Sequence, residues 1–343
     1  MLLDRDAAES FATALFRAAG GTEVTSLLVA RHLVESDRRG VPSHGLLRVT
    51  QYLAEIAAGE IDPTALPSRE RASGARVWLD GNSCFGPVAG SAAVDEAVVV
   101  TASAGVGVVT VRHTGHAGRI GDYVERAARS GLVAVAYCSG PPSGHRVAPF
   151  GATEGRLSTN PIAFAFPTKS EPIVADFSTS AVPEGVVRRL HELGLPVPEG
   201  AVQDPAGRPT TDADVLYSTP PGTILPLGGS RFGHKGFALG LLVEVLATLL
   251  AGDEPADASR YGNNLALITI GVDADFPARA GRLADYVRSA APVDPARPVL
   301  MPGDPERAFA ENEPGVQIDR PTWAALVAAA SERNVPLPAS SDA

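Results

Sequence analysis

The chain has 343 residues, of which 45% are hydrophobic, so it can bury a large core, and its length suggests two domains. Its formal net charge of −10 argues against binding to nucleic acid, because phosphate contacts need clustered lysine and arginine. Two cysteines are too few for a disulfide framework and lack metal-ligand spacing, which favours a reducing, cytoplasmic location. The N-terminal residues MLLDRDAAESF do not resemble a signal peptide.

The first part of the chain predicts helices followed by a strand. Apolar residues recur at helical spacing, Gly20-Gly21 ends the first helix, and Thr22 can cap the second. A stretch without a clean period predicts a linker, and Asp80-Gly81 predicts a turn after the strand. The expected elements are helices at 7–19, 22–37 and 46–59, a linker at 63–74, a strand at 75–81 and an alanine-rich helix at 88–104.

The rest of the chain alternates strands and helices before a proline-rich tail. Residues 183–225 are expected to be irregular, and the apolar stretch 237–250 is expected to be a buried helix, because it carries Glu244 and is short for a membrane span. The predicted strands are 105–111, 132–139, 157–168, 172–180 and 264–272, and the predicted helices are 122–130, 233–252 and 322–333. Helical layers at both ends would therefore flank a central α/β unit.

The loop DRRGVPSHG and the start of the next helix carry the first candidate site. His44 is a possible acid or base, since an imidazole titrates near neutrality, and Ser43 can orient it by a hydrogen bond. Arg48 can hold a substrate carboxylate through both guanidinium nitrogens. The alternative is a polar interhelical loop with a surface histidine.

The loop RHTGHAGRIG has glycines at 115, 118 and 121 just before a helix. Free amides there would suit a pyrophosphate. The loop lacks the Rossmann G-x-G-x-x-G pattern and no ribose-binding acid follows, so a Rossmann fold is not supported. His116 fits an active-site or cofactor contact better than a metal site, because His113 and His116 have no evident third ligand. His32 and His191 are expected on helix surfaces.

The segment PLGGSRFGHKGFALG does not fit a nucleoside-triphosphate loop, because Lys235 neither directly follows the loop glycine nor precedes a serine or threonine. A lysine at the start of an apolar helix still needs a partner. A cofactor phosphate or ribose would serve, as would a surface carboxylate.

Taken together, these segments resemble the malate/L-lactate dehydrogenase-like oxidoreductases, which include ureidoglycolate and sulfolactate dehydrogenases and piperideine/pyrroline-2-carboxylate reductases. The resemblance covers nearly the whole chain. It rests on six segments in order: DRRGVPSHGLLRVTQYL, RHTGHAGRIGDYVERAARSGLVAVAY, APFGATEGRLSTNPIAFAFP, PIVADFSTS, LPLGGSRFGHKGFALGLLVEVLATLLAG and VLMPGDPE.

The resemblance implies a non-Rossmann NAD(P)-binding α/β fold of the α+β type, with a largely antiparallel central sheet and helical N- and C-terminal segments that pack together. It implies a homodimer acting on a small carboxylate, with no membrane, nucleic acid or metal. Residues 76–284 would form the NAD(P)-binding domain. Residues 1–75 and 285–343 would form a helical domain for dimerisation and substrate binding.

The resemblance also assigns the site residues. Ser43, His44 and His116 would be catalytic, with His44 the proton donor in reduction, and Arg48 and Thr159 would bind substrate. The residues assigned to NAD or NADP are His116, Ala117, Gly118, Arg119, Ile120, Asp176, Phe177, Ser178 and Lys235. The implied reaction is hydride transfer between the nicotinamide and the α carbon of a 2-oxo or 2-hydroxy acid.

Two positions depart from the family pattern. Val186 replaces a charged residue, lysine or, in the imine reductases, aspartate, although Glu184 lies nearby. The strand at 264–272 lacks the usual glycine-histidine-aromatic lead-in. A hydroxy acid is therefore favoured over a cyclic imine as substrate. A catalytically silent binding protein with the same fold is the third hypothesis.

Overall fold

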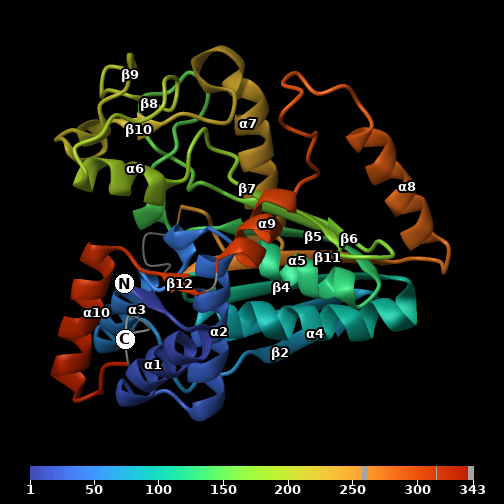
Figure 1. Cartoon of the computed structure of the whole chain (residues 1–343), viewed down its shortest axis with the longest axis horizontal. Helices are drawn as coiled ribbons and strands as arrows, with labels where there is room; N and C mark the ends of the chain where they lie inside the picture. The colour runs from blue at the N-terminus through green and yellow to red at the C-terminus, as the bar shows by residue number, and fades with distance from the viewer. Residues whose placement is uncertain (257–261, 314, 339–343) are drawn as a thin grey trace.

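A seven-stranded mixed sheet forms the centre of the protein (Figure 1). The computed structural model describes residues 1–256, 262–313 and 315–338. The strand order is β2-β3-β4-β11-β5-β6-β7, and only β3 and β4 are parallel neighbours, which confirms the largely antiparallel sheet. The strand bounds are β2 Ser68–Ser73, β3 Arg76–Cys84, β4 Val106–Thr114, β5 Leu132–Ser139, β6 Ile162–Phe166, β7 Ile173–Phe177 and β11 Asn263–Gly271.

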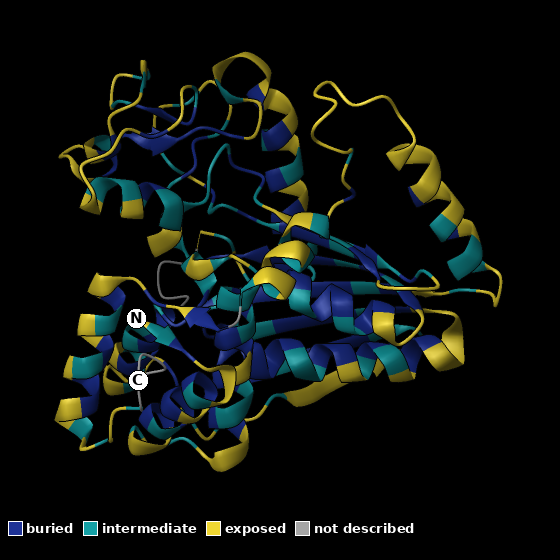
Figure 2. Cartoon of the chain, in the orientation of Figure 1, coloured by how far each residue is buried: buried dark blue, intermediate teal, exposed yellow. Residues whose placement is uncertain are grey.

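Helices cover both faces of this sheet because successive strand residues point to opposite faces. Ala134, Ala136 and Leu267 belong to the main core, which includes residues of α4 (Gly86–Ala104) and α5 (Gly121–Arg129). The alternate residues Val135, Tyr137 and Ala266 pack with Val243 and Ala247, which lie at the junction of α7 (Gly229–Val243) and the π-helical turn η4 (Glu244–Leu249). Figure 2 shows the buried strands between these layers.

The two ends of the chain pack together, as expected. The strand β1 (Leu2–Leu3) pairs with β12 (Val316–Gln317), and the amino group of Met1 donates to the carbonyl of Ile318 at 3.0 Å. The helices around them are α1 Arg5–Ala18, α2 Glu23–Arg38, α3 Arg48–Ala57 and α10 Arg320–Arg333. Thr22 caps α2 through a capping box with Thr25, as the sequence predicts.

The segment 183–225 is ordered, so the expectation of an irregular region is wrong. It contains α6 (Glu184–Glu192), the 3-10 helix η3 (Ala213–Tyr217) and, in one small sheet, the strands β8 Val202–Gln203, β9 Pro209–Thr210 and β10 Thr223–Ile224. These elements share a core of their own that includes Val187, Val202 and Leu216. Two-residue strands between prolines are too short to show an apolar period, so their pairing depends on this core.

Three further predictions about secondary structure are wrong. The expected linker contains β2, whose residues SRERAS are all exposed and so show no buried alternation. The strand β3 continues past Asp80-Gly81, and the positive φ angles lie instead at Asn82 and Ser83. The proline-rich tail is preceded by α8 (Phe276–Arg288) and contains α9 (Asp304–Asn312), both mostly exposed helices that begin with proline in their first turn.

The apolar helix at Gly229–Leu249 has nearly the length that the sequence predicts for residues 233–252, with its start four residues earlier. Its 21 residues are long and apolar enough to cross a membrane by length and composition, and 39% of its most apolar window is buried in the structure. The expectation that this stretch is too short for a membrane span is therefore wrong. The expectation of burial holds only in part, since Val243, Glu244 and Ala247 are buried and other side chains of the helix are exposed. Length and composition of this kind also occur in core helices of globular proteins, so the helix alone does not indicate a membrane.

Candidate active site

The loop between α2 and α3 places Ser43 beside His44. The 3-10 turn η1 (Pro42–His44) is fixed by the Asp37 carboxylate, which accepts the amide of Leu46 at 2.7 Å. A Cβ on Gly45 would lie 2.0 Å from Asp37 Oδ1, so only glycine fits there. Ser43 Oγ lies 3.0 Å from Nδ1 of His44. The predicted serine–histidine pair is therefore present in the structure.

His44 faces His116, which comes from the glycine-rich loop after β4. Their rings are stacked with centroids 5.4 Å apart. Burial, followed by the charge of Arg48, lowers the pKa of His44 to about 3. Burial and Arg48 also hold the pKa of His116 well below its usual value. Both imidazoles are therefore neutral at physiological pH.

Tyr52 completes this group, and the sequence analysis did not identify it. Its hydroxyl lies 2.8 Å from Nδ1 of His116 and also donates to the His116 carbonyl at 3.3 Å. Tyr52 is fully buried, and burial raises the pKa of its hydroxyl. One signal was available, since Tyr52 lies four residues after Arg48 and so on the same face of α3.

Arg48 is a buried cation without a carboxylate partner among the described residues. It is 8% exposed, donates from Nε to the Ser43 carbonyl at 2.7 Å and from Nη1 to Gln51 at 2.6 Å. Burial lowers the pKa of its guanidinium. A buried charge without a counter-ion is costly, so an anionic ligand at this position would be strongly favoured. We call Ser43, His44, Arg48, Tyr52 and His116 the histidine cluster.

The glycine-rich loop does not offer the free amides that the sequence predicts. The amides of Ala117, Arg119 and Gly121 already donate to Asn263, His32 and Asp176 at 2.8, 3.0 and 2.7 Å. The prediction that these three amides form an anion site is therefore wrong. The side chains that occupy them instead hold the loop in one conformation.

His32 is one of these side chains, and its expected place on a helix surface is wrong. It is buried in α2, accepts the Arg119 amide at Nε2 and lies with Nδ1 3.6 Å from Asp122. The loop approaches it so closely at Gly118, where φ is +70°, that a Cβ there would lie 2.2 Å from Nε2. The sequence showed this histidine only as a polar residue in a helix. His191 is partly exposed and contacts Asp214 at 2.7 Å.

The other predicted cofactor and substrate residues lie around the end of β7: Asp176 and Phe177 are its last two residues, Ser178 follows it, and Thr159 precedes β6. The carbonyl of Thr159 accepts the amide of Thr179 at 3.0 Å, which joins the STNP segment to this strand end. Asp176 and Phe177 are exposed there, and Ser178 Oγ donates to the Ser180 carbonyl at 3.1 Å. Buried Arg119 leaves Nε and Nη2 without a hydrogen-bond partner within the described residues, and Nη2 forms a longer ion pair with Glu125 at 3.6 Å. Exposed acid and aromatic groups beside such donors fit a nucleotide cofactor.

Lys235 and His113 lie apart from the histidine cluster. Lys235 is exposed on α7, with Nζ 5.7 Å from the Phe232 ring centroid, and no ion pair holds it in the described part of the chain. His113 belongs to β4 and pairs with Asp80 at 2.9 Å. No group of three or more histidine, cysteine, aspartate or glutamate residues is placed to hold a metal among the described residues.

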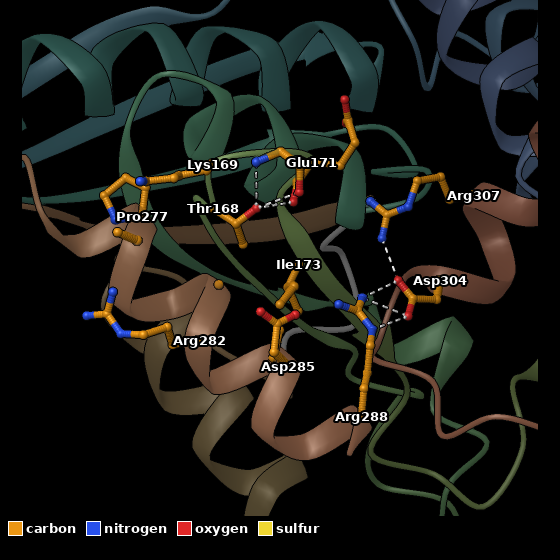
Figure 3. Close-up of a pocket in the computed structure, with 14 residues that line it drawn as sticks. Thr168, Lys169, Glu171, Ile173, Pro277, Arg282, Asp285, Arg288, Asp304 and Arg307 are labelled. Atoms are coloured by element: carbon orange, nitrogen blue, oxygen red, sulfur yellow. Dashed lines mark hydrogen bonds and ion pairs between the residues drawn. The ribbon is translucent and has the colours of Figure 1, made fainter. Parts of the chain in front are cut away.

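A cavity of about 570 Å³ lies elsewhere, between the β6–β7 loop and α8 (Figure 3). Arg288 and Arg307 line it and both contact the Asp304 carboxylate, at 2.9 and 2.7 Å. None of its lining residues belongs to the histidine cluster. Arg288 and Arg307 already pair with Asp304, and no histidine that could act as an acid or base lines the cavity. It is therefore a poorer candidate for the active site than the cluster around Arg48.

Comparison with known proteins agrees with this geometry. The sequence model described as malate/L-lactate dehydrogenase matches residues 3–327. The chain is 34% identical to an L-lactate dehydrogenase of Cupriavidus necator, over 90% of this chain and 91% of that one. It is 35% identical to a (2R)-3-sulfolactate dehydrogenase (NADP(+)) of Chromohalobacter salexigens, over 71% of each chain. It is 34% identical to a Δ1-pyrroline-2-carboxylate/Δ1-piperideine-2-carboxylate reductase of Pseudomonas putida, over 71% of this chain and 69% of that one.

A solved structure shows the same fold. The malate dehydrogenase of Entamoeba histolytica superimposes with a TM-score of 0.92 at 26% sequence identity, and the match covers 99% of both chains.

Proposed function

The chain belongs to the malate/L-lactate dehydrogenase family, and from this premise we propose that it is an NAD(P)-dependent oxidoreductase of a small 2-oxo or 2-hydroxy acid. One observation carries the proposal: the buried Arg48 has no carboxylate partner among the described residues and lies beside the neutral His44. A substrate carboxylate would neutralise this cation and place the neighbouring carbon near an acid–base group.

In this proposal each member of the cluster has a separate role. Arg48 holds the carboxylate with its guanidinium. When Nδ1 of His44 donates its proton to Ser43 Oγ, the other ring nitrogen is free to take the proton of the substrate hydroxyl, and it returns that proton in reduction. Tyr52 fixes the orientation of His116 on the opposite side. A bound nicotinamide supplies or accepts the hydride.

The carboxylate also tunes His44 in this scheme. Arg48 is one of the charges that lower the pKa of His44, after burial. An anion bound to Arg48 offsets that charge, so His44 holds a proton more readily when substrate is present than when it is absent. This would favour the transfer of the hydroxyl proton only after the acid has bound.

For the cofactor, we propose that NAD or NADP lies along the segment from His116 to Ile120 and the end of β7. The residues that would hold it there are Asp176, Phe177 and Ser178, with Lys235 on α7. The polar donors of Arg119 and the exposed ring of Phe177 support this position. Val186 and the absence of the usual aspartate favour a hydroxy acid over a cyclic imine.

We also propose a soluble, cytoplasmic homodimer. Large apolar side chains are exposed on α7 and η4, among them Leu241, Leu242 and Leu249, and on α8 at Leu283 and Tyr286. A surface of this kind costs free energy in water, and a second copy of the chain would cover it. Both cysteines are buried and neither belongs to a disulfide, which is consistent with a reducing compartment.

A screen of 2-oxo acids and cyclic imines with NADH and NADPH tests the activity. We expect oxidation of the reduced cofactor with a 2-oxo acid, and a loss of turnover in His44→Ala while the protein still quenches NAD(P)H fluorescence. Binding of neither cofactor would overturn the proposal. Cofactor binding without turnover of any acid or imine would favour the silent binding protein, and turnover of imines alone would favour the imine reductase.

A further inference from the structure

We infer that Glu244, a buried acid in the π-helical turn η4, is a positioning residue of the proposed active site. Its carboxylate holds Asn160, and Asn160 in turn fixes the proposed substrate residue Thr159 and the proposed cofactor residues 176–178 in one arrangement. This inference rests on the proposed function. It gives a role to an acid that does not itself touch substrate or cofactor in that proposal.

The first support is the cost of burying this carboxylate. Glu244 is 4% exposed in the apolar helix at Gly229–Leu249, and no lysine, arginine or histidine nitrogen of the described residues lies within 4.0 Å of it. A carboxylate removed from water without a counter-ion is destabilising, so packing alone would favour an apolar residue at this position. The hydrogen bonds that the carboxylate accepts therefore point to a role other than filling the core.

The second support is the state of Asn160, which accounts for one of these hydrogen bonds. Asn160 is fully buried and has a φ of +39°, in the left-handed region that few residues other than glycine adopt. Its Nδ2 donates to Oε1 of Glu244 and to the carbonyl of Gly240, both at 2.9 Å, and its Oδ1 accepts the hydroxyl of Ser158. The conformation of the STNP segment thus depends on acceptors that α7 and η4 supply.

The third support is what the anchored segment holds. The carbonyl of Thr159 accepts the amide of Thr179 at 3.0 Å, and the carbonyl of Asn160 accepts the Thr179 hydroxyl at 2.9 Å. Thr179 directly follows the proposed cofactor residues 176–178, and a Cβ on Gly240 would lie only 3.1 Å from its Oγ1. A shift of Asn160 would therefore move the proposed substrate residue and the end of β7 together.

The other oxygen of Glu244 links the same acid to the glycine-rich loop. Oε2 accepts the Thr248 hydroxyl at 2.9 Å, and Thr248 also contacts the hydroxyl of Ser139. The Ser139 carbonyl accepts Nδ2 of Asn263 at 3.0 Å, and Asn263 Oδ1 accepts the amide of Ala117 at 2.8 Å. Glu244 thus joins both sides of the proposed site, and π-helical turns within longer helices are frequent at functional sites.

A purely structural role is the competing explanation, and the pair Thr101–Thr269 provides the comparison. Their hydroxyls form a buried hydrogen bond of 2.6 Å between α4 and β11, near the opposite end of β11 from Asn263. Neither threonine contacts a residue of the proposed site among the described residues. If Glu244 served only to stabilise the fold, losing its hydrogen bonds would affect the enzyme as losing this pair does.

The test measures steady-state kinetics with varied NAD(P)H and with the 2-oxo acid that the wild type reduces fastest. Glu244→Leu removes both acceptors, and we expect kcat/KM to fall about 10- to 100-fold with a raised KM for both ligands, because a displacement of about 1 Å at a positioning group is enough for this. Glu244→Gln keeps an oxygen for Asn160 and should recover most of the loss. A folded Glu244→Leu protein with wild-type kinetics, or an equal loss in Glu244→Gln, would overturn the inference.

A second pair of variants decides the question if Glu244→Leu does not fold. Thr248→Val and Thr101→Val each remove one buried hydroxyl with little change of shape, so both should lower the melting temperature by a similar amount. Only Thr248→Val should raise the KM values, and equal KM values for the two variants would leave Glu244 a purely structural role. Turnover by the wild type with unchanged KM in Thr248→Val would overturn the inference alone, whereas no turnover of any acid or imine would overturn the proposed function as well.

Discussion

The Tyr52 hydroxyl contacts Nδ1 of His116 at 2.8 Å within the histidine cluster, although the two residues lie 64 residues apart in the chain. Tyr52→Phe removes only the hydroxyl that touches Nδ1 and the carbonyl of His116. We expect kcat to fall at least about tenfold, because a mispositioned acid–base group loses much of its contribution. Steady-state kinetics of the purified variant measure this.

Tyr137→Phe is the matched control, because Tyr137 is a partly buried tyrosine that packs on the opposite face of the sheet. An equal fall in kcat for Tyr137→Phe would show that the loss of any tyrosine hydroxyl, and not the contact with His116, causes the change.

The lowered pKa of His44 also predicts how stability depends on pH. The unfolded chain binds a proton at this histidine near its ordinary pKa of 6.5, whereas the folded chain does so only near about pH 3. The contribution of neutral His44 to the free energy of unfolding should therefore be complete above about pH 6.5. Below that pH the free energy of unfolding should fall by up to about 1.4 kcal/mol per pH unit. Urea unfolding of the wild type and His44→Asn at several values between about pH 7 and 5 measures this slope.

His44→Asn removes one titrating group, so its slope should be smaller by the contribution of one proton. His116 has a pKa lowered in the same direction and should leave part of the slope in place. Identical slopes for the two proteins would mean that His44 is not held neutral in the folded state.

At the scale of elements, the glycine-rich loop depends on its contact with α2. Gly118→Ala forces a side chain into a positive φ and also against Nε2 of His32, at 2.2 Å. We expect the KM for NAD(P)H to rise, because the loop from His116 to Ile120 must move away from His32. Kinetics with varied cofactor, together with thermal unfolding, measure both effects.

Gly131→Ala separates strain from contact. Gly131 has a φ of +80° at the end of α5, and a Cβ there meets nothing within 4 Å. Both variants should lose stability of roughly 1 kcal/mol from backbone strain, but only Gly118→Ala should change the KM for the cofactor. A similar KM change in both would contradict a specific role for the His32 contact.

For the whole molecule, the exposed apolar face of α7 and η4 predicts how two copies associate. Leu241 and Leu249 are 50% and 47% exposed, and charged residues there would oppose burial in a dimer interface. We expect the double variant Leu241→Glu/Leu249→Glu to be monomeric in light scattering after size exclusion, while the wild type is a dimer.

The control for this experiment is Leu66→Glu, which changes another exposed leucine, 59% accessible, just before β2. It should leave the dimer intact. A monomeric wild type would contradict the proposed homodimer, and a dimeric double variant would place the interface on a different surface.

The sequence determined the parts of this protein that depend on neighbouring residues. Local apolar spacing and capping were enough to predict α1, α2 and α10. The short segment from Ser43 to Arg48 places its serine, histidine and arginine on one loop and the adjoining helix turn. The order of the six segments was enough to predict the family, which the comparisons confirm, and its largely antiparallel sheet, which the structure confirms. The polar β2, the short strands of segment 183–225 and the exposed α8 lack a local pattern, so they were missed.

Only the tertiary structure decided which partners the hydrogen-bonding groups of the loops have. Asn263, His32 and Asp176 reach the glycine-rich loop from 146, 87 and 55 residues away, and they occupy the amides that the sequence predicts to be free for a pyrophosphate. Packing likewise buries Arg48 beside Gly185 and turns His32 inward. Each of these contacts joins segments far apart in the chain, and hydrogen-bond partners at such separations are fixed by the packing of whole elements and not by local sequence.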